Sequence, residues 1–207
     1  ICFEPISVKP IIMKNFTYLL LLAGSISLAT TASAQPRLAA KAGINYGGLS
    51  GYKDGKKTSL HAGIALQWAG KKKISFQPEL LYQRIVQGYL TEVNEQAVEN
   101  SLSISMVSIP LMVQYYPVKT FFLEAGPQWS VTAGARNEEA GGTKSDVRRN
   151  LANLQLGFCG GAGIELKRKL VFYIRYQAGM TDMTLYDADN DYIRSAQAGL
   201  LVRLGKK

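Results

Sequence analysis

The fold of this chain is constrained most by an alternation of apolar with small or polar residues, which recurs eight times. Residues 60–68, for example, place Leu60 and Ile64 on one face and His61 and Gln67 on the other. Successive side chains of a β-strand point to opposite faces of a sheet, and no long stretch shows helical spacing instead. The alternating runs are residues 38–46, 60–68, 74–83, 102–115, 121–131, 154–166, 170–180 and 196–204. They predict eight β-strands and an all-β fold.

The lengths of the connections between these runs supply a second, independent signal. Long connections follow the first, third, fifth and seventh runs (47–59, 86–100, 134–152 and 182–191), and short ones follow the second, fourth and sixth (69–73, 116–120 and 167–169). Long loops at one rim and tight turns at the other are typical of outer membrane barrels. The sequence therefore predicts an eight-stranded antiparallel up-and-down transmembrane β-barrel, with both termini and the short turns on the periplasmic side.

The fourth run contains a change of phase. Its apolar residues occupy even positions up to Met106 and odd positions from Val107 onward. Pro110 lies close to this change and cannot donate a hydrogen bond to a neighbouring strand. Because an extra residue in one strand shifts the phase of its side chains, we expect a β-bulge beside Pro110.

The N-terminal segment has the layout of a secretory signal peptide. Lys14 supplies a positive charge, residues 18–28 are an apolar stretch, and Ala32-Ser33-Ala34 has the small residues of a cleavage site. The apolar stretch falls short of the ~20 residues that a transmembrane helix needs. We expect translation to start at Met13. Residues 1–34 are then an upstream extension and a signal peptide cleaved after Ala34, and residues 35–207 form an outer membrane barrel domain.

Composition excludes several classes of function. The chain has 24 Lys and Arg against 15 Asp and Glu, but only one histidine and two cysteines. A His-rich metal site or a disulfide scaffold would lack its ligands, and no cofactor is expected. Exported proteins seldom meet nucleic acid, and the basic residues here cluster in turns such as 71–73 and 167–169, so we expect no nucleic-acid binding.

The two faces of the predicted strands differ in bulk, which indicates which of them lines the interior. Side chains just fill the interior of an eight-stranded barrel, so the face rich in Gly, Ser, Gln and Ala should point inward and the bulky face toward lipid. Membrane barrels carry aromatic girdles at both interfaces. Candidates are Trp68, Phe76, Tyr115, Phe121 and Phe172 near the short turns, and Tyr46, Tyr82, Trp129, Tyr176 and Tyr192 near the loops. The alternative is a soluble periplasmic lipocalin-like carrier with its apolar face inside.

The same parity places six charged residues in the lumen. They are Lys41, Glu79, Glu124, Glu165, Arg175 and Arg203. Isolated charges in a narrow interior are costly, so these side chains should pair with one another. By their heights on the strands, Glu79 and Glu124 should meet Lys41 and Arg175, and Glu165 should meet Arg203. The group would act either as a path for ions or protons or as a polar plug that replaces a hydrophobic core, and we favour the plug.

Several segments together resemble a known family. They are Lys41-Ala42-Gly43-Ile44-Asn45, Gln77-Pro78-Glu79-Leu80-Leu81-Tyr82, Ser108-Ile109-Pro110-Leu111, Leu123-Glu124-Ala125-Gly126-Pro127-Gln128 and Gly161-Ala162-Gly163-Ile164-Glu165-Leu166. In this order they resemble the PorT-like outer membrane β-barrel domain family over about residues 36–204. The resemblance implies an eight-stranded barrel of the Gram-negative cell envelope, inserted by the barrel assembly machinery. It implies no catalytic residue, and residues 200–207 lack the terminal aromatic that this machinery usually reads.

Function is expected in the external loops, where binding residues concentrate. Loop 86–100 is acidic and loop 48–59 is basic. Asp187, Asp189 and Asp191 alternate in a manner that suits Ca²⁺, although the glycine and distal glutamate of a full calcium loop are missing. We expect a non-catalytic, monomeric barrel in contact with outer membrane lipid, with a structural, adhesion or binding role toward an extracellular partner. The alternative, implied by the resemblance, is an accessory component of protein secretion across the outer membrane.

Overall fold

The computed structural model describes residues 36–51, 55–70, 73–93, 96–138, 144–167, 169–183 and 191–204. The predicted signal peptide and its cleavage site lie outside these ranges. The elements are β1 (Arg37–Leu49), β2 (Lys56–Ala69), β3 (Ile74–Val93), β4 (Gln96–Val118), β5 (Phe121–Glu138), β6 (Lys144–Asp146), the 3-10 turn η1 (Arg148–Asn150), β7 (Leu154–Lys167), β8 (Leu170–Gly179) and β9 (Ile193–Arg203). In this part of the chain no helix is long and apolar enough to cross a membrane.

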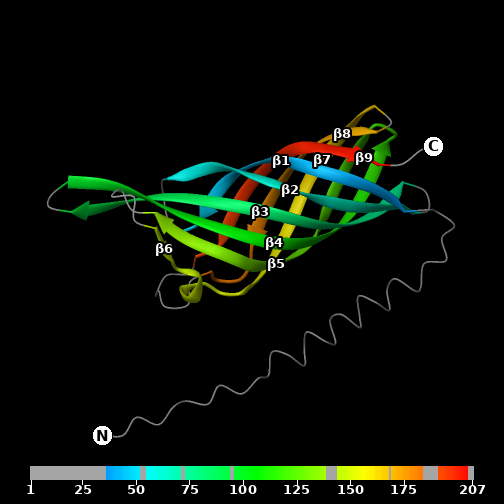
Figure 1. The fold of residues 1–207 in the computed structure, drawn as a ribbon. Coiled ribbons are helices and arrows are strands. Elements are labelled where there is room, and N and C mark those ends of the chain that lie inside the picture. The colour runs from blue at the N-terminus through cyan, green and yellow to red at the C-terminus, as the bar shows by residue number, and fades with distance from the viewer. Residues whose placement is uncertain are drawn as a thin grey trace, which may run out of the picture. The chain divides into compact units, whose positions relative to one another are not determined.

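Eight of the strands close into a barrel (Figure 1). The sheet runs β4-β3-β2-β1-β9-β8-β7-β5, and a pairing between β4 and β5 joins its two edges. Every pairing is antiparallel, and the first and last strands meet in continuous register from Ala39↔Arg203 to Leu49↔Ile193. The short strand β6 pairs only with the C-terminal end of β5, on the side of the long loops. The predicted eight-stranded antiparallel barrel is confirmed.

The strands extend further on the loop side than the alternation predicted. β3 has 20 residues and β4 has 23, and their pairing continues to Val93↔Gln96. The prediction of a loop over 86–100 is therefore wrong. β2 accompanies β3 only as far as Gln87, so the β3–β4 hairpin projects beyond the rest of the barrel, as Figure 1 shows. Residues 86–100 lack the apolar alternation that marks the other strands, which is why the sequence did not predict strands there.

The prediction of a bulge beside Pro110 is also wrong. β4 and β5 pair without interruption from Met106↔Thr132 to Pro110↔Gln128. The irregularity lies one step further out, where Ser105 pairs with Gly134, so the extra residue, Ala133, belongs to β5. The change of phase in β4 has another cause. Ile104 and Met106 are fully buried and point into the barrel, whereas Val107 is exposed on its outside.

The apolar face of the strands covers the outside of the barrel, and the polar face lines the inside. Leu60 is 68% exposed and Ile174 is 53% exposed, whereas Gln83 and Gln128 are buried. A soluble lipocalin-like carrier has the opposite arrangement, so this structure contradicts that alternative. The outer surface is suited to hydrocarbon, and the closed sheet pairs the backbone polar groups between strands, as a membrane requires.

Glycines give large inward side chains room in the narrow lumen. Gly163 of β7 lies directly across from Phe122 of β5, and a Cβ added to Gly163 would come within 2.2 Å of the ring atom Cζ of Phe122. Phe122 is buried and its ring lies 5.3 Å from that of Tyr116, measured between centroids. The ring of Phe122 therefore has little freedom to move away.

Replacing Gly163 by alanine is expected to lower the free energy of unfolding by about 1–3 kcal/mol, the usual cost of overpacking a core. Gly160→Ala on the same strand is the matched control, because a Cβ at Gly160 meets nothing within 4 Å. Urea titration of both variants in detergent would measure the difference. Equal stabilities for the two variants would show that the lumen tolerates the extra methyl group.

Candidate functional site

Four charged side chains from four strands meet in the middle of the lumen. They are Lys41 of β1, Glu79 of β3, Glu124 of β5 and Arg175 of β8, and all are buried. Lys41 Nζ lies 2.9 Å from both carboxylate oxygens of Glu79. Arg175 donates to both oxygens of Glu79 at 2.9 Å, and its Nε donates to Glu124 Oε1 at 2.8 Å. Two cations and two carboxylates thus form one neutral group, called here the ion cluster.

Neutral neighbours complete the hydrogen bonding of the ion cluster. Gln77 Nε2 donates to Glu79 Oε1 at 2.8 Å, and Gln114 Nε2 donates to Glu124 Oε2 at 3.2 Å. The Nζ atom of Lys41 lies 3.9 Å from the centroid of the Tyr173 ring, a cation–π distance. Because buried charges stabilise a fold only when paired and fully hydrogen-bonded, this arrangement can replace a hydrophobic core.

The other two predicted lumen charges pair near the short-turn end of the barrel, which is the predicted periplasmic end. Arg203 of β9 forms an ion pair with Glu165 of β7, and its Nε donates to Gln67 Oε1 at 3.2 Å. Gln67 in turn donates to Gln114 Oε1 at 2.8 Å and to the hydroxyl of Tyr116 at 2.9 Å. Gln114 also bonds Glu124, so a hydrogen-bonded chain connects this pair to the ion cluster.

The single histidine of the chain lies in the same interior. His61 Nδ1 is 2.6 Å from Asn45 Oδ1, and His61 Nε2 forms a hydrogen bond with the hydroxyl of Tyr173. His61 is buried and points into the barrel, away from the outer surface. Both ring nitrogens are hydrogen-bonded to these two partners, so the role of His61 in the network is structural.

Amide and hydroxyl groups continue the network away from the ion cluster. Gln83 Nε2 donates to Ser108 Oγ at 2.8 Å, and Ser108 and Ser130 share a hydrogen bond of 2.8 Å. Gln128 donates to Ser130 at 3.0 Å and accepts a hydrogen bond from the Cys159 thiol at 3.1 Å. Cys159 is therefore a small buried donor in this layer.

Two apolar clusters lie on either side of this polar interior, and sequence analysis missed both. The outer apolar cluster contains Leu49, Ile85, Ile104, Met106, Ala135, Leu151, Met183 and Ile193. The inner apolar cluster contains Ala39, Ala65, Phe122, Val171, Tyr173 and Leu201. Parity had assigned the positions of the inner apolar cluster to a polar interior and had assigned Ile104 and Met106 to the lipid-facing side. The other positions of the outer apolar cluster lie outside the alternating runs. The phase change before Val107 was the one available signal, because it moves apolar residues of β4 onto the inner face.

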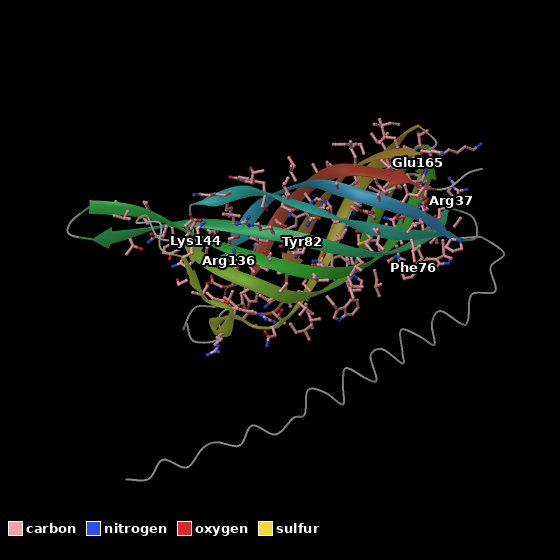
Figure 2. All side chains as sticks on the ribbon, in the orientation of Figure 1. Arg37, Phe76, Tyr82, Arg136, Lys144 and Glu165 are labelled. Carbon is pink, nitrogen blue, oxygen red and sulfur yellow. The ribbon has the colours of Figure 1, made fainter. Side chains whose placement is uncertain are left out.

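The structure places the ten candidate girdle aromatics at the surface or partly buried beneath it. Tyr46, Tyr82 and Tyr176 are at least half exposed, and Trp68 stacks on its cross-strand partner Phe76 with centroids 6.2 Å apart. Figure 2 shows Phe76 closer than Tyr82 to the end of the barrel that holds Arg37. Two belts at the membrane interfaces remain a prediction from these positions.

The calcium candidate lies largely outside the described residues, because Asp187 and Asp189 fall in 184–190. Asp191 is buried, and its Oδ1 accepts a hydrogen bond from the backbone N–H of Gly51 at 2.8 Å. Asp182 Oδ1 accepts a hydrogen bond from the backbone N–H of Asp191 at 3.0 Å. Within the described ranges no group of three or more His, Cys, Asp or Glu could hold a metal ion.

A closed eight-stranded barrel with an apolar outer surface and a filled polar interior defines the class of small outer membrane barrels. The family model described as outer membrane protein beta-barrel domain matches residues 33–185. The chain belongs to this family, and the protein is located in the outer membrane. The match confirms that the resembling segments belong to an outer membrane β-barrel domain, and the PorT-like assignment stays a prediction.

The comparison with solved structures finds one of this fold and a second with a lower similarity. Neisserial surface protein A, from Neisseria, superposes with a TM-score of 0.53 at 14% identity, covering 84% of this chain and 100% of that chain. Ail, the attachment invasion locus protein of Yersinia pestis, was solved in complex with the heparin analogue sucrose octasulfate. It superposes with a TM-score of 0.49 at 10% identity, covering 84% of this chain and 100% of that chain. At these identities the likeness concerns the fold alone. No curated protein matches the sequence significantly.

Proposed function

We propose that this protein is a non-catalytic binding or adhesion module whose barrel anchors an extracellular surface. One observation carries the proposal: the ion cluster is internally neutral and lies between two apolar clusters. At the outer end, an ion or proton crossing the lumen would have to leave water and pass the outer apolar cluster, which is costly. The interior therefore serves as a plug, and contact with partners falls to the outer end.

The outer end presents two structured elements. The projecting β3–β4 hairpin carries Leu90, which is 70% exposed, and the hydroxyl of Tyr89 donates to Asn137 Oδ1 at 2.8 Å, which ties the hairpin to β5. Beside it, β6 and η1 expose Lys144 and the adjacent residues Arg148 and Arg149, as the burial pattern shows. A rigid hairpin next to exposed cations is a surface on which an extracellular partner can bind.

Removing residues 90–99 is expected to abolish partner binding and leave the barrel intact, because β2 pairs with β3 only up to Gln87. Cells that display the full-length protein and the shortened variant would be compared for adhesion to surfaces coated with extracellular matrix. Unboiled and boiled electrophoresis of the outer membrane fraction would check that both barrels fold. Equal adhesion of the two, at a level above that of cells without the protein, would remove the hairpin from the proposal.

A part in protein secretion is the second proposal, and it rests on the PorT-like resemblance. All five resembling segments supply lumen residues: Lys41 and Asn45, Gln77 and Glu79, Ser108, Glu124 and Gln128, and Glu165. These segments therefore account for the barrel and its plug, which is why adhesion or binding is placed first. Co-purification of secretion components with the full-length protein would reverse that order. Export with cleavage after Ala34 and a monomeric state remain predictions.

A further inference from the structure

The lumen opens at its periplasmic end into a cavity of about 710 Å³. Four cationic side chains line it, Arg37, Lys73, Lys119 and Arg203, together with one carboxylate, Glu165. Figure 2 shows Arg37 and Glu165 at the same end of the barrel. This end carries both termini of the barrel and the short turns, so the cavity faces the periplasm.

Among the described residues, the one carboxylate that lines the cavity is already neutralised. Glu165 pairs with Arg203, which is also held by Gln67. Lys73 Nζ donates to the carbonyl of Pro117 at 2.9 Å, a bond that leaves its charge unbalanced. Arg37 and Lys119 form no ion pair with another described residue. Three positive charges therefore face one cavity without a counter-charge from the described part of the chain, and such a field attracts an anion.

The position of the cations favours a ligand from the periplasm over a lipid headgroup. Arg37 pairs across the strands with the buried Gln67, and Arg203 pairs with the buried Ala39. Cross-strand partners share a face, so both arginines belong to the inner face of the barrel wall. The lipid face at this end carries apolar side chains, including Leu38 and Val202. A lipid headgroup would meet that outer face, whereas an anion from the periplasm enters the mouth.

We propose that this cavity, the periplasmic mouth, binds an acidic peptide segment of a periplasmic partner. Its volume is far larger than a lone phosphate needs and lies in the range of pockets that hold extended ligands. Arginine binds carboxylates through two parallel hydrogen bonds. Aliphatic wall residues, Ala69, Ile74 and Val118, offer contacts to the rest of a peptide. The site lies at the opposite end from the surface assigned to extracellular binding and does not depend on that function.

Binding of a fluorescent hexaglutamate peptide to the protein in phosphatidylcholine nanodiscs would test this proposal. Arg37→Gln combined with Lys119→Gln is expected to weaken binding about tenfold, because it removes two of the three unbalanced charges. Lys169→Gln is the matched control, since Lys169 is exposed at the same end but does not line the cavity. It should change the affinity less than about twofold, because its charge is screened by salt. Unchanged migration of unboiled samples would show that the variants are folded.

Several results would overturn the assignment. A hexaglutamine peptide that binds equally well would show that the carboxylates are not recognised. An equal loss of affinity in Lys169→Gln would show that the peptide responds to the general positive charge at this end of the barrel and not to the cavity. If inorganic phosphate displaced the peptide at a concentration similar to that of the peptide, the periplasmic mouth would be a site for a small anion. Loss of peptide binding in nanodiscs that contain phosphatidylglycerol, with binding retained in phosphatidylcholine, would assign it to lipid headgroups.

Discussion

Replacing Glu79 by glutamine is expected to lower the free energy of unfolding by about 3–5 kcal/mol, the cost of leaving a buried charge without its partner. Of the described carboxylates, Glu79 is the one that contacts both Lys41 and Arg175, each at 2.9 Å, and all three side chains are buried. Glutamine preserves the size of the side chain but leaves the ion cluster with a net positive charge. Urea titration of the folded barrel in detergent would measure the change.

Two further variants make this prediction specific. Glu138→Gln removes the same charge from the exposed pair with Lys144, whose ions are 3.4 Å apart, and should cost less than about 1 kcal/mol. Adding Lys41→Gln to Glu79→Gln restores neutrality in the lumen and should recover part of the loss, because the two sites are coupled. If Glu79→Gln were no more damaging than Glu138→Gln, the ion cluster would not be what holds the interior together.

Replacing Ile174 by arginine is expected to lower the free energy of unfolding by about 2–4 kcal/mol, the cost of a cation near the middle of the bilayer. Ile174 is exposed on the outer face of β8, between Phe172 and Tyr176, which belong to opposite predicted girdles. The comparison of folding in lipid vesicles with and without the substitution would measure this cost.

Leu90→Arg is the matched control for Ile174→Arg. Leu90 is also an exposed apolar residue on a strand, but it lies on the projecting part of the β3–β4 hairpin, beyond the last pairing with β2 at Gln87. An arginine there remains in water and should change stability by less than about 0.5 kcal/mol, as is usual for surface substitutions. Similar costs at both positions would mean that the membrane does not end where the projecting hairpin begins.

The sequence was informative wherever one face of a strand meets lipid. There the requirement for an apolar exterior is imposed residue by residue, so alternation in β1, β7 and β8 reports the orientation of each side chain directly. The partners of the lumen charges also followed from parity and height. Lys41 and Arg175 meet Glu79, and Arg203 meets Glu165, as the order of the strands requires.

Where lipid does not contact the strands, the sequence did not show the orientation of the side chains. The outer parts of β3 and β4 lack the apolar alternation of the other strands, so no pattern separated them from a loop over 86–100. The inward position of Ile104 and Met106 was misread for a related reason. The presence of an apolar residue indicates that its side chain is shielded from water. It does not indicate whether lipid or a neighbouring side chain covers it.

The sequence by itself determined the number of barrel strands, the outward face of most strands and the charges that enter the lumen. These properties depend on local alternation and on the difference between an apolar exterior and a narrow interior. Only the tertiary structure decided that apolar clusters lie at both ends of the ion cluster and that a cationic cavity opens toward the periplasm. Both features join residues from distant strands, and closure of the sheet sets those contacts, which no single strand encodes.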